Sequence, residues 1–124
     1  RPLGLEDASA ELGVLFAVLA HHGHADATEA RRAYERGLAA LLPRARPDYA
    51  EPSPTAWAGP LDAALARLDR LAPAAKELLV EALARCVEHD GRVDLREAEL
   101  LRAACAALHC PLPPLYAGLE AHAA

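Results

Sequence analysis

The stretch EHDGRVDLREAELL, residues 88–101, contains the turn on which the predicted fold depends. Gly91 is the residue type that adopts the left-handed conformation in which many helices end. Asp94 is followed three residues later by Glu97, and this spacing is typical of a capping box at the start of a helix. Apolar residues on both sides recur at helical spacing. The stretch therefore predicts one helix that ends, a short turn, and a second helix.

The same pattern occurs earlier in the chain. The segments HHGHADATEA (21–30) and HDGRVDLREA (89–98) both follow an apolar helix and precede another. Their shared residues fit one structural device, a glycine that ends a helix and an Asp–Glu pair that caps the next. We therefore expect two similar helix–turn–helix halves. The aligned pairs are His21 and His89, Gly23 and Gly91, Asp26 and Asp94, Glu29 and Glu97, and Ala30 and Ala98.

Apolar residues follow helical spacing through most of the chain, and no stretch alternates with the period of two that a half-buried strand requires. We therefore predict an all-α fold of five to six helices, with the two halves separated by a further helix. The predicted helices run from Asp7 to His21, up to Leu42, onward from Pro60, from Pro73 to the Gly91 turn, and from Leu95 to about His109, with a last short helix that carries Leu115 and Leu119.

The length of 124 residues suits one domain with one core, so residues 1–124 are predicted to form a single helical domain. Half of the ten prolines fall within residues 43–60, which are expected to form a surface connection without regular helix. Trp57 is expected to hold this connection against the domain. The sequence begins with Arg1 and contains no methionine, so we expect the domain to be excised from a longer protein.

Composition and charge exclude several classes of protein. The net charge of −5 argues against nucleic-acid binding, because phosphate recognition needs a basic surface. The longest apolar run, GVLFAVLA (13–20), is too short to cross a bilayer, so no membrane insertion by this domain is expected. The three cysteines form no CxxC pair, and Cys86 and Cys105 fall on apolar helix faces, which indicates buried thiols.

Motifs for catalysis are absent from the sequence. It contains no HExxH metalloprotease motif, no GxSxG motif and no phosphate-binding glycine loop. The two serines, Ser9 and Ser53, have no neighbouring base in sequence that would activate a hydroxyl. We therefore expect that this chain is not an enzyme.

A calcium site is one alternative to the capping interpretation. In a calcium-binding helix–loop–helix, a glycine is followed six residues later by a bidentate glutamate. Glu97 stands in that relation to the glycine of the turn, and Asp90 and Asp94 would supply further oxygen donors. Cys86 occupies the position of the leading carboxylate, so any calcium binding in this frame is expected to be weak.

The earlier turn offers a second metal-binding hypothesis. His22 and His24, with Asp26 or Glu29, combine imidazole and carboxylate donors that suit zinc or nickel. Exposed histidines in a turn are more often ordinary polar residues. The sequence predicts no resident cofactor and leaves open a weakly bound divalent cation at one of the two turns.

The segment KELLVEALARCVEHDGRVDLREAELLRAACAALHCPLPPL, residues 76–115, resembles part of a known family. It is similar to the helical C-terminal domain of the HtpX-like bacterial membrane-bound zinc metallopeptidases, described as Zn-dependent proteases with chaperone function. The segment LAHHGHADATEARRAYERGLAAL (19–41) resembles the earlier half of that domain more loosely. The pattern DG-x-V-x-x-x-E is also similar to TerB-like helical domains of the tellurite-resistance type.

This resemblance implies a non-catalytic domain appended to a membrane-bound metallopeptidase. The family's catalytic residues correspond to no position in this sequence, because the HExxH motif is absent. The implied role is interaction or regulation, with the protein's own peptidase domain, another protein or a second copy of the chain as partner. The implied location is the cytoplasmic side, tethered to the inner membrane by the rest of the protein. The alternative is a TerB-like module that binds a divalent metal.

Overall fold

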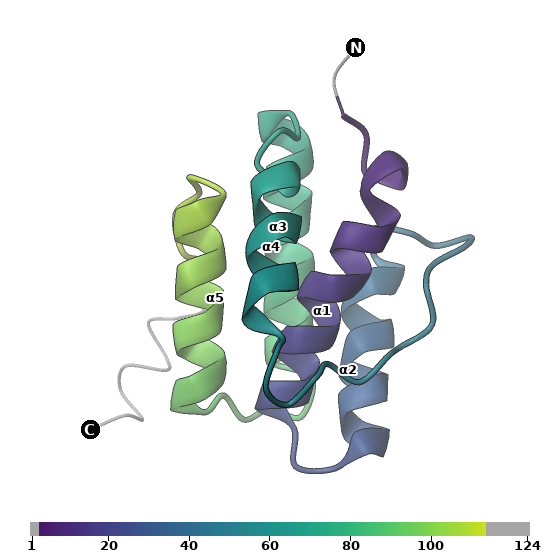
Figure 1. The fold of residues 1–124 in the computed structure, drawn as a ribbon, viewed down its shortest axis with the longest axis vertical. Coiled ribbons are helices and arrows are strands. Elements are labelled where there is room, and N and C mark those ends of the chain that lie inside the picture. Colours follow the sequence, from purple (N-terminus) through teal and green to yellow (C-terminus); the bar gives the residue numbers. More distant parts are fainter. Residues whose placement is uncertain (1–2, 114–124) are drawn as a thin grey trace.

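The protein is all-helical in the computed structural model, which describes residues 3–113 (Figure 1). Within that range there are five α-helices, a short 3-10 helix and no β-strand. This confirms the predicted fold class; the last short helix expected at Leu115 and Leu119 lies outside the described residues. The elements are η1 (Glu6–Ala8), α1 (Ser9–Gly23), α2 (Ala27–Ala39), α3 (Ala58–Leu68), α4 (Pro73–Val87) and α5 (Leu95–Ala107).

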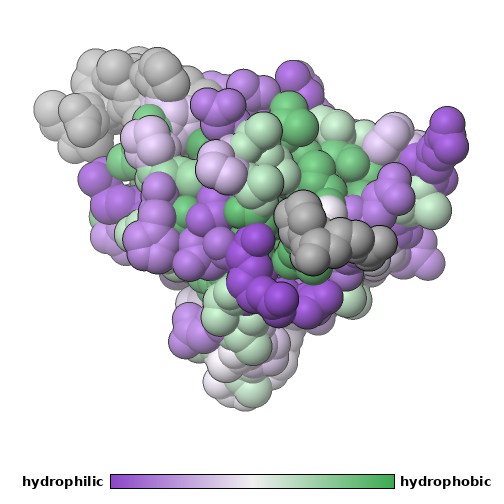
Figure 2. Space-filling view, turned by 90° about the horizontal axis from the view of Figure 1, so that it is seen from above, coloured by the Kyte–Doolittle hydropathy of each residue, from purple (hydrophilic) through white to green (hydrophobic). Residues whose placement is uncertain are grey.

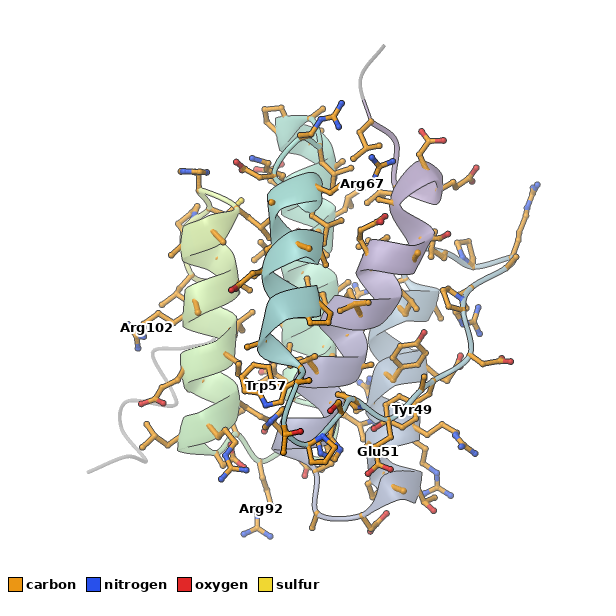
Figure 3. All side chains as sticks on the ribbon, in the orientation of Figure 1. Tyr49, Glu51, Trp57, Arg67, Arg92 and Arg102 are labelled. Carbon is orange, nitrogen blue, oxygen red and sulfur yellow. The ribbon has the colours of Figure 1, made fainter. Side chains whose placement is uncertain are left out.

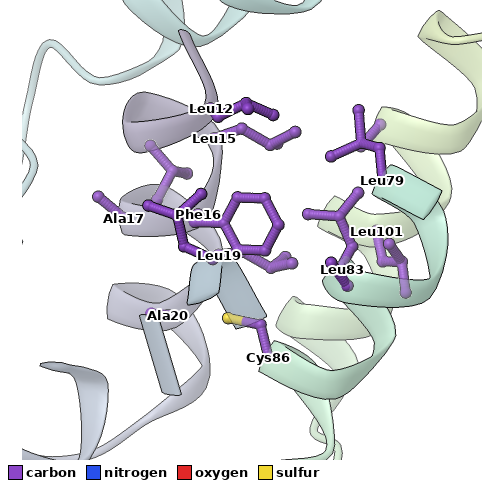
Figure 4. Packing of buried hydrophobic residues seen from close by; sticks show 14 of the residues in the cluster. Leu12, Leu15, Phe16, Ala17, Leu19, Ala20, Leu79, Leu83, Cys86 and Leu101 are labelled. Carbon is purple, nitrogen blue, oxygen red and sulfur yellow. The ribbon is translucent and has the colours of Figure 1, made fainter. Parts of the chain in front are cut away.

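Helix α1 is the centre of the bundle. It contacts all four other helices, with α2 on one side and α3 and α5 on the other in Figure 1. Its residues are apolar on nearly every side, as a helix surrounded by others requires. Figure 4 shows Phe16 of α1 pointing toward Leu83 of α4, and both side chains are fully buried. Burial of such side chains contributes about 1.5–3 kcal/mol each and is the main source of stability.

Close approach of α2 to its neighbours depends on a glycine. A Cβ atom at Gly37 would lie 2.8 Å from a ring carbon of Phe16, 2.9 Å from the Cβ of Cys86 and 3.0 Å from the carbonyl oxygen of Ala82. Cys86 and Cys105 are fully buried, as predicted, and burial raises the pKa of the Cys105 thiol to about 11. Small residues therefore allow the helices to pack closely around α1.

Most predicted helix boundaries differ from the structure by two or three residues, and those of α3 and α4 have a clear physical reason. Residues 43–60 were expected to contain no regular helix, which is wrong at their end, because α3 begins at Ala58. Pro60 lies in the first turn of α3, where a missing backbone N–H removes no helical hydrogen bond. Helix α4 ends at Val87, before Gly91, although Gly91 adopts the predicted left-handed conformation with φ 72°.

Residues 40–57, called the connecting segment below, join α2 to α3. In Figure 1 they leave the upper end of α2, swing outward and cross in front of α2 and α1 to reach the lower end of α3. The Tyr34 hydroxyl donates a hydrogen bond to the carbonyl oxygen of Pro47, and Arg46 pairs with Glu35 at 2.7 Å. Trp57 is partly buried, and its ring centroid lies 4.7 Å from that of His22. Trp57 therefore holds the segment against α1, as predicted.

The two predicted halves correspond to the pairs α1–α2 and α4–α5. Both pairs are joined by turns at the same end of the bundle, the lower end in Figure 1. The pairs are packed differently, since α1 is central and α5 lies at the edge of the bundle. The two halves therefore resemble each other most in the position of their turns and less in the packing of their helices.

Figure 2 views the end of the bundle at which α1 begins. Hydrophobic residues gather in the upper part of this face, and strongly hydrophilic residues lie both below its centre and at its sides. None of the helices in residues 3–113 combines the length and hydropathy needed to cross a membrane.

Candidate functional site

The turns of the two halves meet at the lower end of the bundle and enclose a cavity of about 400 Å³. We call this region the turn junction: the turn at residues 24–26, the turn at residues 88–94, and the Glu97 side chain. His89 links the two halves directly, since its Nε2 lies 3.2 Å from an Oε2 carboxylate oxygen of Glu29. The cavity itself is lined by Glu97 together with His21, His22, Gly23, His24, Ala25, Asp90, Arg92, Asp94 and Arg96.

The capping box predicted at the start of α5 is confirmed. The backbone N–H of Glu97 donates to Oδ1 of Asp94 at 2.8 Å, and the backbone N–H of Asp94 donates to Oε1 of Glu97 at 3.4 Å. At the start of α2, Asp26 accepts the equivalent hydrogen bond from the N–H of Glu29 at 2.8 Å. The Glu29 carboxylate does not return that bond, because it pairs with Arg32 and His89.

Asp94→Ala is therefore expected to destabilise the protein by about 1 kcal/mol, because α5 loses its cap. Asp94→Asn is expected to retain most of the stability, since an amide oxygen also accepts the hydrogen bond from the helix. Urea unfolding of the three proteins, with and without chelator, measures both effects. A loss in Asp94→Asn that occurs only in metal-containing buffer would contradict the capping role of Asp94 and indicate a metal ligand.

The Glu97 side chain is buried, with 1% of its surface exposed. Its Oε2 atom has no hydrogen-bond partner within the described residues. Desolvation by burial raises the pKa of Glu97 to about 8; the hydrogen bond from the Asp94 backbone lowers it, and the charges of Asp94 and Asp90 raise it further. Gly23 makes room for this carboxylate, since a Cβ atom at position 23 would overlap it. Glu97 therefore packs into the turn of the other half.

Two histidines complete the interior of the junction. His24 is buried, and its Nδ1 lies 3.0 Å from the carbonyl oxygen of Ala20, so that nitrogen carries the proton. The Nε2 of His24 lies 4.0 Å from Oδ2 of Asp90 and makes no hydrogen bond in residues 3–113. The Nδ1 of His89 is likewise buried without a partner there. Three buried polar atoms, one each from Glu97, His24 and His89, are therefore unpaired in the described part of the chain.

The structure brings most of the predicted metal-ligand candidates around the junction cavity. His22, His24, Asp90, Asp94 and Glu97 line it, whereas Asp26 does not. His22 donates through Nδ1 to the carbonyl oxygen of Val18 at 2.9 Å, and its ring contacts Trp57. The Oδ1 atom of Asp90 accepts a hydrogen bond from the backbone of Arg92 at 3.0 Å.

No three His, Cys, Asp or Glu side chains in residues 3–113 are arranged to hold a metal ion. The candidate oxygens for calcium are engaged locally, because Asp94 and Glu97 each use one in the capping box. Sequence reasoning missed His89 as a member of the junction. The available signal was its alignment with His21, one of the three histidines in the earlier turn.

A second cavity, of about 450 Å³, lies between α1 and the connecting segment and is called the α1 groove below. Its floor is the face of α1 that the other helices leave uncovered. A Cβ atom at Gly13 would lie 3.2 Å from Cγ of Pro47, so this glycine lets the connecting segment approach α1. Figure 3 shows Glu51 and Trp57 on the part of the segment that crosses the bundle. The floor residues are Ala10, Gly13, Val14, Ala17 and Val18, and the wall includes Tyr34, Pro47, Pro52, Trp57 and Pro60.

The α1 groove has the size and lining of a binding site. Cavities of about 300–1,000 Å³ with mostly apolar walls and few polar groups are typical of ligand sites. The polar groups at the α1 groove are two serines, the Tyr34 hydroxyl and the carboxylates of Asp48 and Glu51. This site was not predicted, because the small apolar residues of α1 have the pattern of an ordinary core helix.

Comparisons with known proteins found no matching family model, no matching curated protein and no matching solved structure.

Proposed function

We propose that this chain is a non-catalytic interaction and regulatory domain, appended to a membrane-bound zinc metallopeptidase on its cytoplasmic side. The resemblance of residues 76–115 to the helical domain of HtpX-like peptidases supports the attachment. The absence of an HExxH motif supports a non-catalytic role. In this proposal the domain recognises a protein, either its own peptidase body or a separate partner.

The α1 groove is the observation that carries this proposal. Its floor is apolar and belongs to the central helix α1, where Ala10 is exposed and Val14 partly exposed, and rigid elements position binding sites well. The connecting segment beside it lacks regular secondary structure from residue 46 to residue 53, and long loops on a rigid scaffold commonly carry recognition. Ser53 has a local structural role, since its hydroxyl accepts the backbone N–H of Ala56 at 3.1 Å.

Photo-crosslinking in cells tests whether the α1 groove contacts a protein. A photoreactive phenylalanine analogue replaces Ala50, an exposed residue of the groove wall, or Glu81, an exposed residue of α4 outside it. We expect a discrete adduct from position 50 and none from position 81, with the partner identified by mass spectrometry. Equal adducts from both positions, or none from position 50, would count against recognition at the α1 groove.

A second candidate function is weak binding of a divalent cation at the turn junction. The three unpaired buried atoms of Glu97, His24 and His89 favour it, because unpaired buried polar groups are costly. Imidazole and carboxylate donors together suit zinc or nickel better than calcium, which prefers six to eight oxygen ligands. Because no three such side chains in residues 3–113 are arranged as ligands, these residues would have to move together to hold the ion, and its binding would link the two halves.

Metal addition to chelated protein tests this candidate through the melting temperature. If zinc binds the junction, it raises the melting temperature, because ligand binding to the native state stabilises it. His24→Gln is then expected to abolish the increase. His109→Gln is the control, since His109 pairs with Asp69 rather than with a residue of the junction. An increase that persists in His24→Gln would place the metal elsewhere.

A further inference from the structure

The charges that line the α1 groove are all of one sign. Asp48 and Glu51 contribute carboxylates, and none of the described residues that line it is a lysine, arginine or histidine. Both carboxylates belong to exposed residues of the connecting segment. Glu51 has His21 as an ion-pair partner at 3.6 Å, which is charged only when protonated, and the neighbouring Arg46 is paired with Glu35. An occupant with a positive charge is therefore favoured, and an acidic one is repelled.

Residues 48–51 of the connecting segment run beside the α1 groove without helix, strand, turn or bend. Among residues 3–113, the amides of Tyr49, Ala50 and Glu51 donate to no backbone carbonyl and no side chain. An extended segment with free backbone groups can pair with another extended chain, and main-chain hydrogen bonds of this kind provide affinity in strand-addition complexes. The small residues of the floor, such as Ala10 and Val14, leave space for the side chains of such a chain.

We infer that the α1 groove binds an extended, apolar peptide segment that carries an arginine or lysine. This inference rests on the proposed function and specifies its partner. Apolar side chains of the peptide lie on the α1 floor, and the cation lies between Asp48 and Glu51. Trp57 lines the same cavity, and an arginine of the peptide that reaches its ring would gain a cation–π contact.

Fluorescence anisotropy with three labelled octapeptides tests the inference. Each peptide alternates valine and alanine and differs at one central residue, which is arginine, its neutral isostere citrulline, or glutamate. We expect the arginine peptide to bind about three- to ten-fold more tightly than the citrulline peptide, as two partly exposed ion pairs allow. The glutamate peptide is expected to bind more weakly than either.

The complementary experiment neutralises the two carboxylates of the protein and repeats the titrations with the same peptides. Asp48→Asn with Glu51→Gln is expected to lower the affinity for the arginine peptide to that for the citrulline peptide, which itself stays unchanged. The control is Glu77→Gln with Glu81→Gln, an equal change of charge on exposed residues of α4 outside the α1 groove. This control is expected to leave all three affinities unchanged.

The outcomes separate this inference from the proposed function. If the three peptides bind alike, or if neutralising Asp48 and Glu51 changes nothing, the charge preference is refuted and recognition at the α1 groove still stands. If no peptide binds while Ala50 crosslinks a protein in cells, the extended-peptide inference is refuted alone. If no peptide binds and no crosslink forms, the proposed function is refuted as well.

Discussion

Gly23→Ala is expected to destabilise the protein by about 1–3 kcal/mol at pH 5, the usual cost of overpacking, because Glu97 is then protonated in the folded protein and gains little from moving to solvent. The added Cβ atom would occupy the position of the Glu97 carboxylate, so that buried side chain must move. Movement of Glu97 also breaks its hydrogen bond to the backbone of Asp94 and weakens the cap of α5. In an unobstructed helix the same change would stabilise, because alanine loses less conformational freedom than glycine.

Gly59→Ala is the matched control for this change. Gly59 lies in α3, and a Cβ atom there would meet nothing within 4 Å. We expect Gly59→Ala to be neutral or to gain about 0.5–1 kcal/mol. Equilibrium unfolding in urea measures both variants. If Gly23→Ala proves as stable as the parent, Glu97 does not pack against Gly23, and the described turn junction is wrong.

The second large effect is a pH-dependent loss of stability caused by Glu97. Its pKa is raised from 4.5 to about 8 in the folded protein, mainly by desolvation. Below pH 4.5 the carboxyl is protonated in both the folded and the unfolded state, so it imposes no cost. Between pH 4.5 and about 8 the unfolded chain releases the proton while the folded protein retains it. Stability is therefore expected to fall as pH rises through this window, by about 2–4 kcal/mol.

Glu97→Gln isolates this contribution. The glutamine amide oxygen can still accept the hydrogen bond from the Asp94 backbone, and the side chain does not titrate. We expect the variant to lack this part of the pH dependence and to exceed the parent in stability above pH 8. Glu99→Gln, a change at the exposed neighbouring glutamate of α5, is expected to keep the parent's profile. If the stability of the parent and that of Glu97→Gln change equally with pH across this window, the pKa of Glu97 is not raised.

The features that could be predicted from the sequence are those set by local interactions. The all-α class follows from helical spacing, and the cap at Asp94 follows from a contact between residues three apart. The left-handed turn at Gly91 is likewise a local property. The start of α3 was placed two residues late, at Pro60 instead of Ala58, although Pro60 does lie in the first turn, where proline is tolerated.

The features that could not be predicted depend on contacts between distant parts of the chain. In the repeat, Gly23 aligns with Gly91 and Glu97 aligns with Glu29. Nothing in the sequence indicated that Gly23 packs against Glu97. His89 reaches Glu29 of the other half in the same way. The α1 groove was hidden because Gly13, Val14 and Ala17 have the pattern of core residues. The cavity beside them depends on the path of the connecting segment, which has no periodic signal.

Crosslinking from Ala50 in a protein whose α1 groove has been filled tests the central claim most directly. Ala10 is exposed and lines the groove, so Ala10→Trp should fill part of it without disturbing the core. Ala103→Trp places the same side chain on an exposed position of α5 outside the groove. We predict that the adduct from position 50 is lost with Ala10→Trp and retained with Ala103→Trp. An adduct of equal yield in both proteins would show that the partner does not occupy the α1 groove.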